Sequence, residues 1–204
     1  MKKLLIGLTL AISAAGYVHA EGDAAAGQQK AAVCAACHGA SGVSAVAQWP
    51  NLAGQHSSYL FKQITEIRDG ARNVPEMAGI VDNLSDQDVR DIAAYYSQQP
   101  ANVGQANEEL ALQGRDLYRA GDVARGIPAC TACHLPNGKG NAPAAFPEVS
   151  GQHTTYTINQ LNAFRSGERD NDPAGMMRGI AEKMTDADIE AVAEYMFGLH
   201  GTNR

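Results

Sequence analysis

Beyond its first twenty residues, the chain lacks any apolar run long enough to cross a membrane. A spanning helix needs about 20 consecutive apolar residues, and the later segments are interrupted by charged and polar side chains. Clusters of basic residues are also missing. The 16 Lys and Arg residues face 22 Asp and Glu residues, for a formal net charge of −6. Because phosphate binding needs a concentrated basic surface, this composition argues against nucleic acid as a partner.

The first twenty residues differ from the rest of the chain. Lys2 and Lys3 precede an apolar stretch over residues 4–16, and the small residues near Ala20 follow. This order of charged, apolar and small segments predicts a secretory signal peptide over residues 1–20. We therefore expect an exported protein that loses two positive charges with its leader.

Cysteine is scarce, and its placement is unusual for an exported chain. Four cysteines would ordinarily predict two disulfides. Here each pair forms a Cys-x-x-Cys motif that is followed at once by histidine. The two motifs are Cys34-Ala35-Ala36-Cys37-His38 and Cys130-Thr131-Ala132-Cys133-His134.

Cys-x-x-Cys-His is the attachment signature of c-type haem. The two thiols lie about one helical turn apart and can add to the two vinyl groups, while the histidine reaches the iron. We therefore expect two covalently bound haem c groups. Cys34, Cys37, Cys130 and Cys133 would bind them covalently, and His38 and His134 would be the proximal ligands.

Three other interpretations of the motifs compete with haem. A thioredoxin-like redox pair would need a βαβ context, and a structural zinc site would need further soft ligands, although the chain has no other cysteine. Two short-loop disulfides remain chemically possible, but they would give no role to the histidine that follows each motif. The double occurrence of the motif favours haem.

The chain is an internal repeat. Residues 50–59, PNLAGQHSSY, correspond to residues 147–156, PEVSGQHTTY. After a three-residue insertion, the segment LSDQDVRDIAAYY from Leu84 corresponds to MTDADIEAVAEYM from Met184. Because the match extends over most of each half, a whole domain is duplicated. The sequence predicts a first domain over 21–97, a linker over 98–106 that contains Pro and Gly, and a second domain over 107–204.

Both halves have helical periodicity. In the last segment, Val89, Ile92, Ala93 and Tyr96 fall at i, i+3, i+4 and i+7, which predicts a helix with one apolar face. Residues 189–196 repeat this spacing. The fold class is therefore all-α, with two tandem domains, each of about three helices wrapped around a covalent haem.

The second axial ligand of each iron is expected to be a methionine. Met77 and Met177 are aligned by the repeat and precede the last helix of their halves. Met/His ligation raises the potential of a haem. Met176 remains a competitor for the second iron.

Two residue pairs of the loop before the middle helix are also aligned. His56 and His153 could complete a bis-histidine site, but a surface or capping role fits their place at a helix start better. Pro50 and Pro147 are expected to border the proximal side of each haem.

With CAACHG, CTACHL, the paired GQH segments and two aligned methionines, the sequence resembles the dihaem cytochrome c4 family, a duplicated class I cytochrome c. The resemblance covers nearly all of the mature chain. It implies a periplasmic electron-transfer protein that carries electrons from a quinol–cytochrome c reductase to a terminal oxidase. It also implies possible peripheral membrane association, no small-molecule substrate and no catalytic residue. One departure is an extra stretch, GDVARGIPA, before Cys130.

Two alternative functions would use the same two haems. The chain could be the haem subunit of a larger oxidoreductase, or a dihaem peroxidase-like enzyme. A peroxidase would need one iron without a distal ligand and a polar distal pocket. No distal His/Arg pair can be placed beside either motif, so the sequence favours a carrier with two six-coordinate haems.

Overall fold

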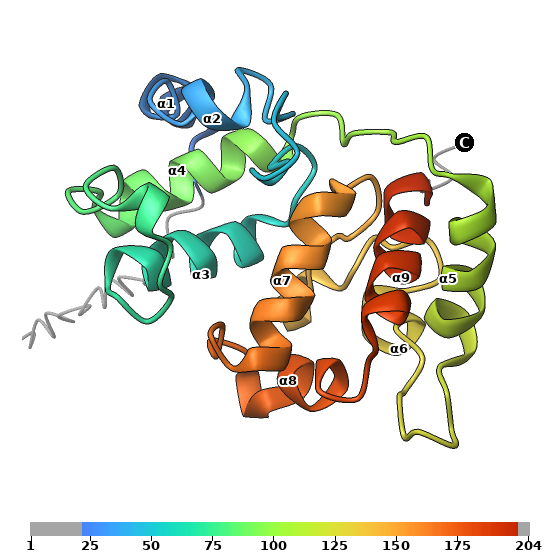
Figure 1. The fold of residues 1–204 in the computed structure, drawn as a ribbon. Coiled ribbons are helices and arrows are strands. Elements are labelled where there is room, and N and C mark those ends of the chain that lie inside the picture. Colours follow the sequence, from blue (N-terminus) through green and yellow to red (C-terminus); the bar gives the residue numbers. More distant parts are fainter. Residues whose placement is uncertain (1–21, 200–204) are drawn as a thin grey trace, which may run out of the picture.

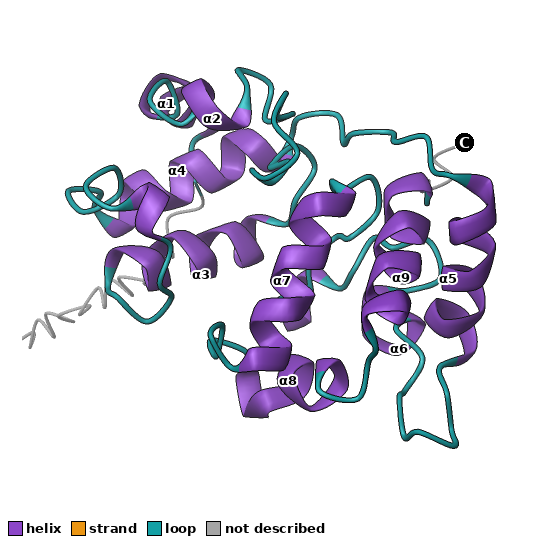
Figure 2. Cartoon of the chain, in the orientation of Figure 1, coloured by secondary structure: helices purple, strands orange, loops and turns teal. Residues whose placement is uncertain are grey.

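The chain folds into two helical lobes in a computed structural model that describes residues 22–199 (Figure 1). The predicted signal peptide over residues 1–20 lies outside this range. Within residues 22–199 the structure contains helices and loops but no strand (Figure 2), apart from two isolated β-bridges. The predicted all-helical fold is therefore confirmed. None of the helices in this range has the length and apolarity needed to cross a membrane.

The two lobes share one order of principal helices, and the second adds the short elements η2 and α8. The first comprises α1 (Ala24–Lys30), α2 (Ala35–His38), α3 (Ser57–Arg68), η1 (Pro75–Met77) and α4 (Asp86–Ser97). The second comprises α5 (Glu108–Ala120), α6 (Thr131–His134), η2 (Ala142–Ala144), α7 (Thr154–Ser166), η3 (Pro173–Gly175), α8 (Met176–Ala181) and α9 (Asp186–Gly198). An extended segment between α4 and α5 joins the lobes (Figure 1).

The last helix of each lobe begins at a capping box. In α4 the Ser85 hydroxyl accepts a hydrogen bond from the Asp88 backbone N–H, and the Asp88 carboxylate accepts one from the Ser85 backbone N–H. Thr185 and Asp188 form the same box at α9. These reciprocal contacts satisfy N–H groups that have no partner inside a helix. The aligned Ser85 and Thr185 therefore begin α4 and α9 at equivalent positions.

The first and last helices of each lobe cross at a glycine. Gly27 of α1 lies against α4, where an added Cβ would come within 1.9 Å of the Asp91 carbonyl oxygen. Gly114 of α5 has the same relationship to Ala191 of α9, also at 1.9 Å. Because only glycine permits this approach, the sequence fixes the same helix crossing in both lobes.

Each lobe has its own apolar core, built around one fully buried tyrosine. Tyr96 comes from α4 in the first lobe, whereas Tyr118 comes from α5 in the second. In the repeat, Met196 corresponds to Tyr96. When the first helices are aligned on Gly27 and Gly114, Ala31 corresponds to Tyr118. The buried tyrosine is thus supplied by the last helix of the first lobe and by the first helix of the second.

The extra stretch before Cys130 forms a tight turn. A backbone bridge joins Asp122 and Ile127, and the Arg125 guanidinium contacts both Asp122 and Asp188. The insertion is therefore held against the start of α9, and the motif helix α6 follows in the same position as α2.

Candidate functional site

Each motif histidine is buried and oriented by a proline carbonyl. The Nδ1 atom of His38 lies 2.9 Å from the carbonyl oxygen of Pro50, and that of His134 lies 3.0 Å from the carbonyl oxygen of Pro147. Both histidines are 8% exposed. A carbonyl can only accept, so Nδ1 carries the hydrogen and Nε2 keeps its lone pair. Each ring therefore keeps Nε2 available to a metal, with a backbone carbonyl fixing its orientation.

The same surroundings keep both rings neutral. Burial lowers the pKa of His38 and of His134, and the hydrogen bond to the proline carbonyl offsets this only in part. Since iron binds the neutral imidazole, the lowered pKa favours the ligating form. Pro50 and Pro147 contact the motif histidines through their backbone oxygens, and their place on the proximal side of each haem stays a prediction.

All four cysteines are free thiols and partly buried. Burial raises the pKa of the Cys34 thiol, and it raises that of Cys130 to about 11. No disulfide forms, and the part of the chain that the structure describes holds no group of three or more His, Cys, Asp or Glu residues suited to a metal ion. The disulfide and zinc interpretations of the motifs therefore find no support in the geometry.

Each aligned methionine packs against the same apolar cluster as the first cysteine of its motif. Met77 and Cys34 border the first core, and Met177 and Cys130 border the second. Met176 is 39% exposed. Met77 and Met177 thus pack against the core of their own lobe, as a motif cysteine does, whereas Met176 is not among the residues packed against the second core.

The aligned histidines of the GQH segments bridge the two lobes. His56 donates from Nε2 to the carbonyl oxygen of Lys139 at 2.6 Å, and His153 donates from Nε2 to that of Ser44 at 3.0 Å. Both stand at helix starts, but neither side chain caps its helix. Their expected surface or capping role is therefore wrong, because each ring forms a hydrogen bond with the opposite lobe.

The glutamines of the same segments reach across in a reciprocal way. The Gln55 side chain bonds both the backbone N–H and the carbonyl of Glu148, each at 2.9 Å. Gln152 bonds the N–H and the carbonyl of Asn51 at 2.9 and 3.0 Å. Asn51 and Glu148 follow the two histidine-binding prolines directly. The loop that orients each motif histidine is therefore held by the other lobe.

A second crossed network joins α3 to α7. Arg72 of the first lobe donates to Tyr156 and Gln160 of the second, at 3.3 and 3.0 Å. Arg169 of the second donates to Tyr59 and Gln63 of the first, both at 3.0 Å. These residues were not predicted as a site, although the repeat aligns the arginine, tyrosine and glutamine of the two lobes.

The two arginines lack an acidic partner within residues 22–199. Arg169 is 9% exposed, and the groups it contacts are neutral. A buried cation is costly unless an anion accompanies it. Haem carries two carboxylates, so the donor set suits that group. Each lobe also provides two thiols for covalent attachment of haem and one neutral imidazole for the iron.

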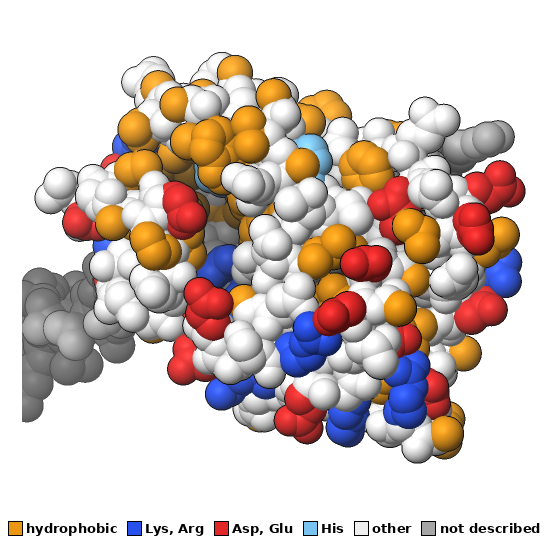
Figure 3. All heavy atoms as spheres, viewed as in Figure 1, with side chains coloured by type: hydrophobic (Ala, Val, Ile, Leu, Met, Phe, Trp, Pro, Cys, Tyr) orange, Lys and Arg blue, Asp and Glu red, His pale blue; other side chains and the backbone are white. Residues whose placement is uncertain are grey.

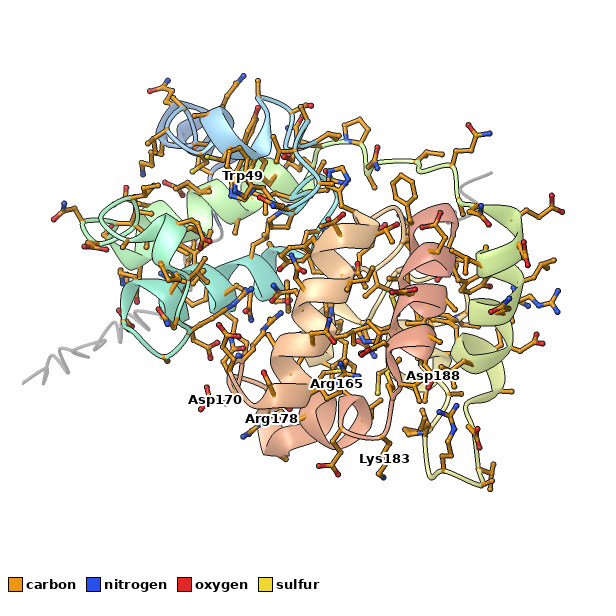
Figure 4. The ribbon with its side chains drawn as sticks, viewed as in Figure 1. Trp49, Arg165, Asp170, Arg178, Lys183 and Asp188 are labelled. Atoms are coloured by element: carbon orange, nitrogen blue, oxygen red, sulfur yellow. The ribbon has the colours of Figure 1, made fainter. Side chains whose placement is uncertain are left out.

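Charge is distributed unevenly over the two lobes. From residue 31 to residue 61 the first lobe has no charged side chain, and Figure 3 shows hydrophobic side chains gathered there beside a hollow. Trp49 belongs to this stretch (Figure 4). The second lobe instead has charged residues at the end that holds α8. Figure 4 labels Arg165, Asp170, Arg178, Lys183 and Asp188 in this region. The lobes therefore present different surfaces to a partner.

Comparison with known proteins agrees with this geometry. The sequence model of the family "Cytochrome c" matches twice, over residues 24–99 and 111–199. Cytochrome c4 of Pseudomonas aeruginosa is 52% identical over 201 residues, which are 98% of this chain and all of the relative. The "Thiosulfate dehydrogenase electron acceptor" of Thiomonas intermedia is 39% identical and covers 84% of this chain and 81% of the relative.

A solved structure shows the same fold. The crystal structure of reduced recombinant cytochrome c4 from Pseudomonas stutzeri superposes with a TM-score of 0.86 at 51% identity, covering 88% of this chain and all of that one. The two Cys-x-x-Cys-His motifs fit two covalently bound haem c groups. The chain therefore belongs to the dihaem cytochrome c4 family, whose members transfer electrons and are not enzymes.

Proposed function

We propose that this cytochrome works in the periplasm, where it carries electrons from a quinol–cytochrome c reductase to a terminal oxidase. The observation that carries the proposal is the duplicated site: each lobe has one motif histidine on a proline carbonyl and one methionine beside the same core. The proposed domains are residues 21–97 and 107–204, joined by a linker over 98–106, after removal of a signal peptide over 1–20.

We assign the covalent attachment to the two cysteine pairs and the axial positions to histidine and methionine. His38 with Met77 would hold the first iron, and His134 with Met177 the second. The partly exposed Met176 supports the choice of its neighbour. Haem supplies the one-electron couple between ferric and ferrous iron when it is bound.

The chain's own residues would set the properties of that couple. The Pro50 and Pro147 carbonyls hold the imidazoles in one orientation, which keeps the change in ligand geometry between redox states small. A thioether is a soft ligand that stabilises ferrous iron, so Met77 and Met177 would raise both potentials. A haem iron held by a histidine and a methionine would have no position left for a substrate.

A second candidate donor is a sulfur-oxidising dehydrogenase. Two relatives, at 39% and 41% identity, are named as electron acceptors of thiosulfate dehydrogenase. Such a donor would keep the carrier function and change only where the electrons come from. The difference between the surfaces of the two lobes supports exchange with two partners of different surface chemistry.

Three measurements test the proposal. A reductive titration with haem quantification should give two haems per chain, and the ferrous protein should resist carbon monoxide at neutral pH. Rapid carbon monoxide binding to one haem would contradict the carrier and favour a peroxidase-like enzyme. Stopped-flow reduction by purified quinol–cytochrome c reductase and by thiosulfate dehydrogenase then distinguishes the donors. The faster reaction identifies the donor, and a slow reaction with the reductase would overturn the respiratory assignment.

A further inference from the structure

The two aligned methionines lie in segments of different structure. Met77 ends the 3-10 turn η1, and the N–H of the residue after it donates to the first carbonyl of that turn at 3.2 Å. Met177 instead lies in the first turn of α8, after a three-residue insertion. There the N–H of the next residue donates to the side chain of Asp172 at 3.0 Å. A backbone contact in the first lobe is thus replaced by a carboxylate contact in the second.

Asp172 supplies the N-terminal cap that α8 otherwise lacks. The N-cap residue of this helix is Gly175, which has no side chain to contribute. Oδ2 of Asp172 accepts from the backbone N–H of Arg178, the third residue of α8. An N-cap side chain ordinarily satisfies this N–H, and the helix dipole also favours a negative charge at this end. The helix that contains Met177 is therefore fixed at its start by Asp172.

Between Asp172 and α8, two successive residues have left-handed backbone. Ala174 has a φ of 54° and Gly175 a φ of 67°. This region is unfavourable for alanine, because its Cβ crowds the following carbonyl oxygen. Such a conformation persists only where surrounding contacts impose it. The contacts between Asp172 and Arg178 close this loop, so they help to impose its conformation.

Both oxygens of the Asp172 carboxylate bind Arg178. Oδ1 accepts from the guanidinium Nε at 2.8 Å, while Oδ2 accepts from the backbone N–H. The Asp172 side chain is 3% exposed, whereas that of Arg178 is 41% exposed. A buried carboxylate that loses its partners is costly. Movement of the first turn of α8 away from Asp172 would leave both oxygens without these partners, so the contact opposes that movement.

We infer that Asp172 is a positioning residue that keeps Met177 at the iron of the second lobe by holding Arg178. Met177 packs against the second core and directly precedes Arg178, so its withdrawal moves the first turn of α8 and breaks the contacts of Asp172. Val74 is the N-cap residue of η1, as Asp172 is of η3, and its side chain offers no acceptor. The N–H that follows Met77 relies on a backbone carbonyl instead. The inference rests on the proposed ligation by Met177.

Displacement of the methionines by imidazole tests the inference. Imidazole binds a ferric haem only where the methionine has left, so its apparent affinity rises with the population of that open state. Asp172→Ala should raise the imidazole affinity of the second haem by about tenfold, the factor expected for loss of a hydrogen bond to a charged group. The first haem should keep the affinity of the parent protein.

Two milder substitutions should have smaller effects on the second haem. In Asp172→Asn the amide oxygen can still accept from the Arg178 N–H, although the ion pair with the guanidinium is lost. Arg178→Ala introduces the residue that stands at the aligned position 78. It removes the guanidinium and keeps the backbone N–H. Both variants should therefore bind imidazole more tightly than the parent and less tightly than Asp172→Ala.

Loss of the thioether-to-iron absorption band follows the displacement in the full dihaem protein, and proton NMR of the two methionine methyl groups assigns it to a lobe. Asp170→Ala is the matched control, since it removes an exposed carboxylate from the same loop (Figure 4) and should leave imidazole binding unchanged. Unchanged binding in Asp172→Ala, or an equal change in Asp170→Ala, would overturn the inference. Equal changes at both haems would also overturn it, because the contacts of Asp172 lie in the second lobe.

Two further measurements separate failure of the ligation from failure of the positioning role. If Met177→His leaves the thioether band and both methyl resonances unchanged, the proposed ligation fails, and the inference fails with it. If they change while Asp172→Ala behaves as the parent, only the positioning role is wrong. Urea unfolding identifies a merely structural role, which would lower the free energy of unfolding without a selective rise in imidazole affinity. If Asp172→Ala does not yield a folded protein, Asp172→Asn and Arg178→Ala decide by the same criterion.

Discussion

The side-chain amide of Gln55 forms two 2.9 Å hydrogen bonds with the main chain of Glu148 in the other lobe. The side-chain amide donates to the backbone carbonyl and accepts from the backbone N–H of the same residue, as a backbone peptide group does in a β-bridge. Gln152 and Asn51 repeat it in the opposite direction. The loops that orient the histidines therefore make one part of the contact between the lobes, and the network between α3 and α7 makes another.

Gln55→Ala and Gln152→Ala should each weaken that contact. Every substitution leaves a buried N–H and a buried carbonyl without their partner, which costs about 1–3 kcal/mol per group. We expect a lower unfolding midpoint and faster proteolysis within residues 98–106. Differential scanning calorimetry and limited proteolysis measure both. Gln105→Ala, at an exposed linker position, is the control, and an equal loss there would contradict the prediction.

Met77→His and Met177→His should each remove part of the thioether-to-iron absorption band of the ferric protein. Each should also lower one of the two potentials, because an imidazole stabilises ferric iron more than a thioether does. Absorption spectra and potentiometric titration check both effects. Met176→His is the matched control for the second site, since Met176 is the exposed neighbour. An unchanged band in Met177→His together with a reduced band in Met176→His would reverse the assignment.

Gly27→Ala and Gly114→Ala should destabilise the lobes to which they belong. A methyl group at either position would overlap a backbone carbonyl across the helix crossing, at 1.9 Å. Overpacking of this kind costs about 1–3 kcal/mol or more, because backbone must move. Gly179→Ala is the control: no atom lies within 4 Å of an added Cβ there, and alanine should stabilise α8 by about 0.5–1 kcal/mol. Urea unfolding of the holoprotein compares the three.

Asp91→Asn should destabilise the first lobe at neutral pH and matter less in acid. Asp91 is 3% exposed and bonds the Lys30 ammonium, which holds the pKa of Asp91 below its usual 3.8. A lowered folded-state pKa contributes stability above pH 3.8 that is lost as the pH falls through the lowered value. We expect a loss of about 2 kcal/mol at pH 7.

Unfolding of the parent and of Asp91→Asn should therefore converge as the pH falls below 3.8. Urea denaturation at pH 7 and at pH 3 gives the two differences in free energy. Asp116→Asn, whose carboxylate is 73% exposed, serves as control and should change little at either pH. A constant difference across this range would contradict the linkage.

Much of the site could be predicted because its signals are local. Cys34 and Cys37 lie one helical turn apart whatever surrounds them, and the motif carries its histidine with it. The repeat then selected Met77 and Met177 by alignment. Neither step required knowledge of how the helices pack.

The contacts between the lobes could not be predicted from the same signals. The alignment shows that His56 and His153 are equivalent, but it does not show whether each ring faces its own lobe or the other. Arg72 and Arg169 are also aligned, and on one lobe alone they would be ordinary solvated cations. Their partners lie about a hundred positions away along the chain, so only the packing of α3 against α7 brings them together.

The reciprocal glutamine contacts have a further consequence. Residue i of one lobe binds residue j of the other, and the equivalent j binds i, which is the pattern of a self-complementary surface. A single lobe therefore already carries both halves of the contact. The linker between α4 and α5 adds a hydrogen bond from the Asn102 side chain to the Gly151 carbonyl at 2.8 Å. It converts an association that would depend on protein concentration into one that does not, because each lobe always has its match within reach.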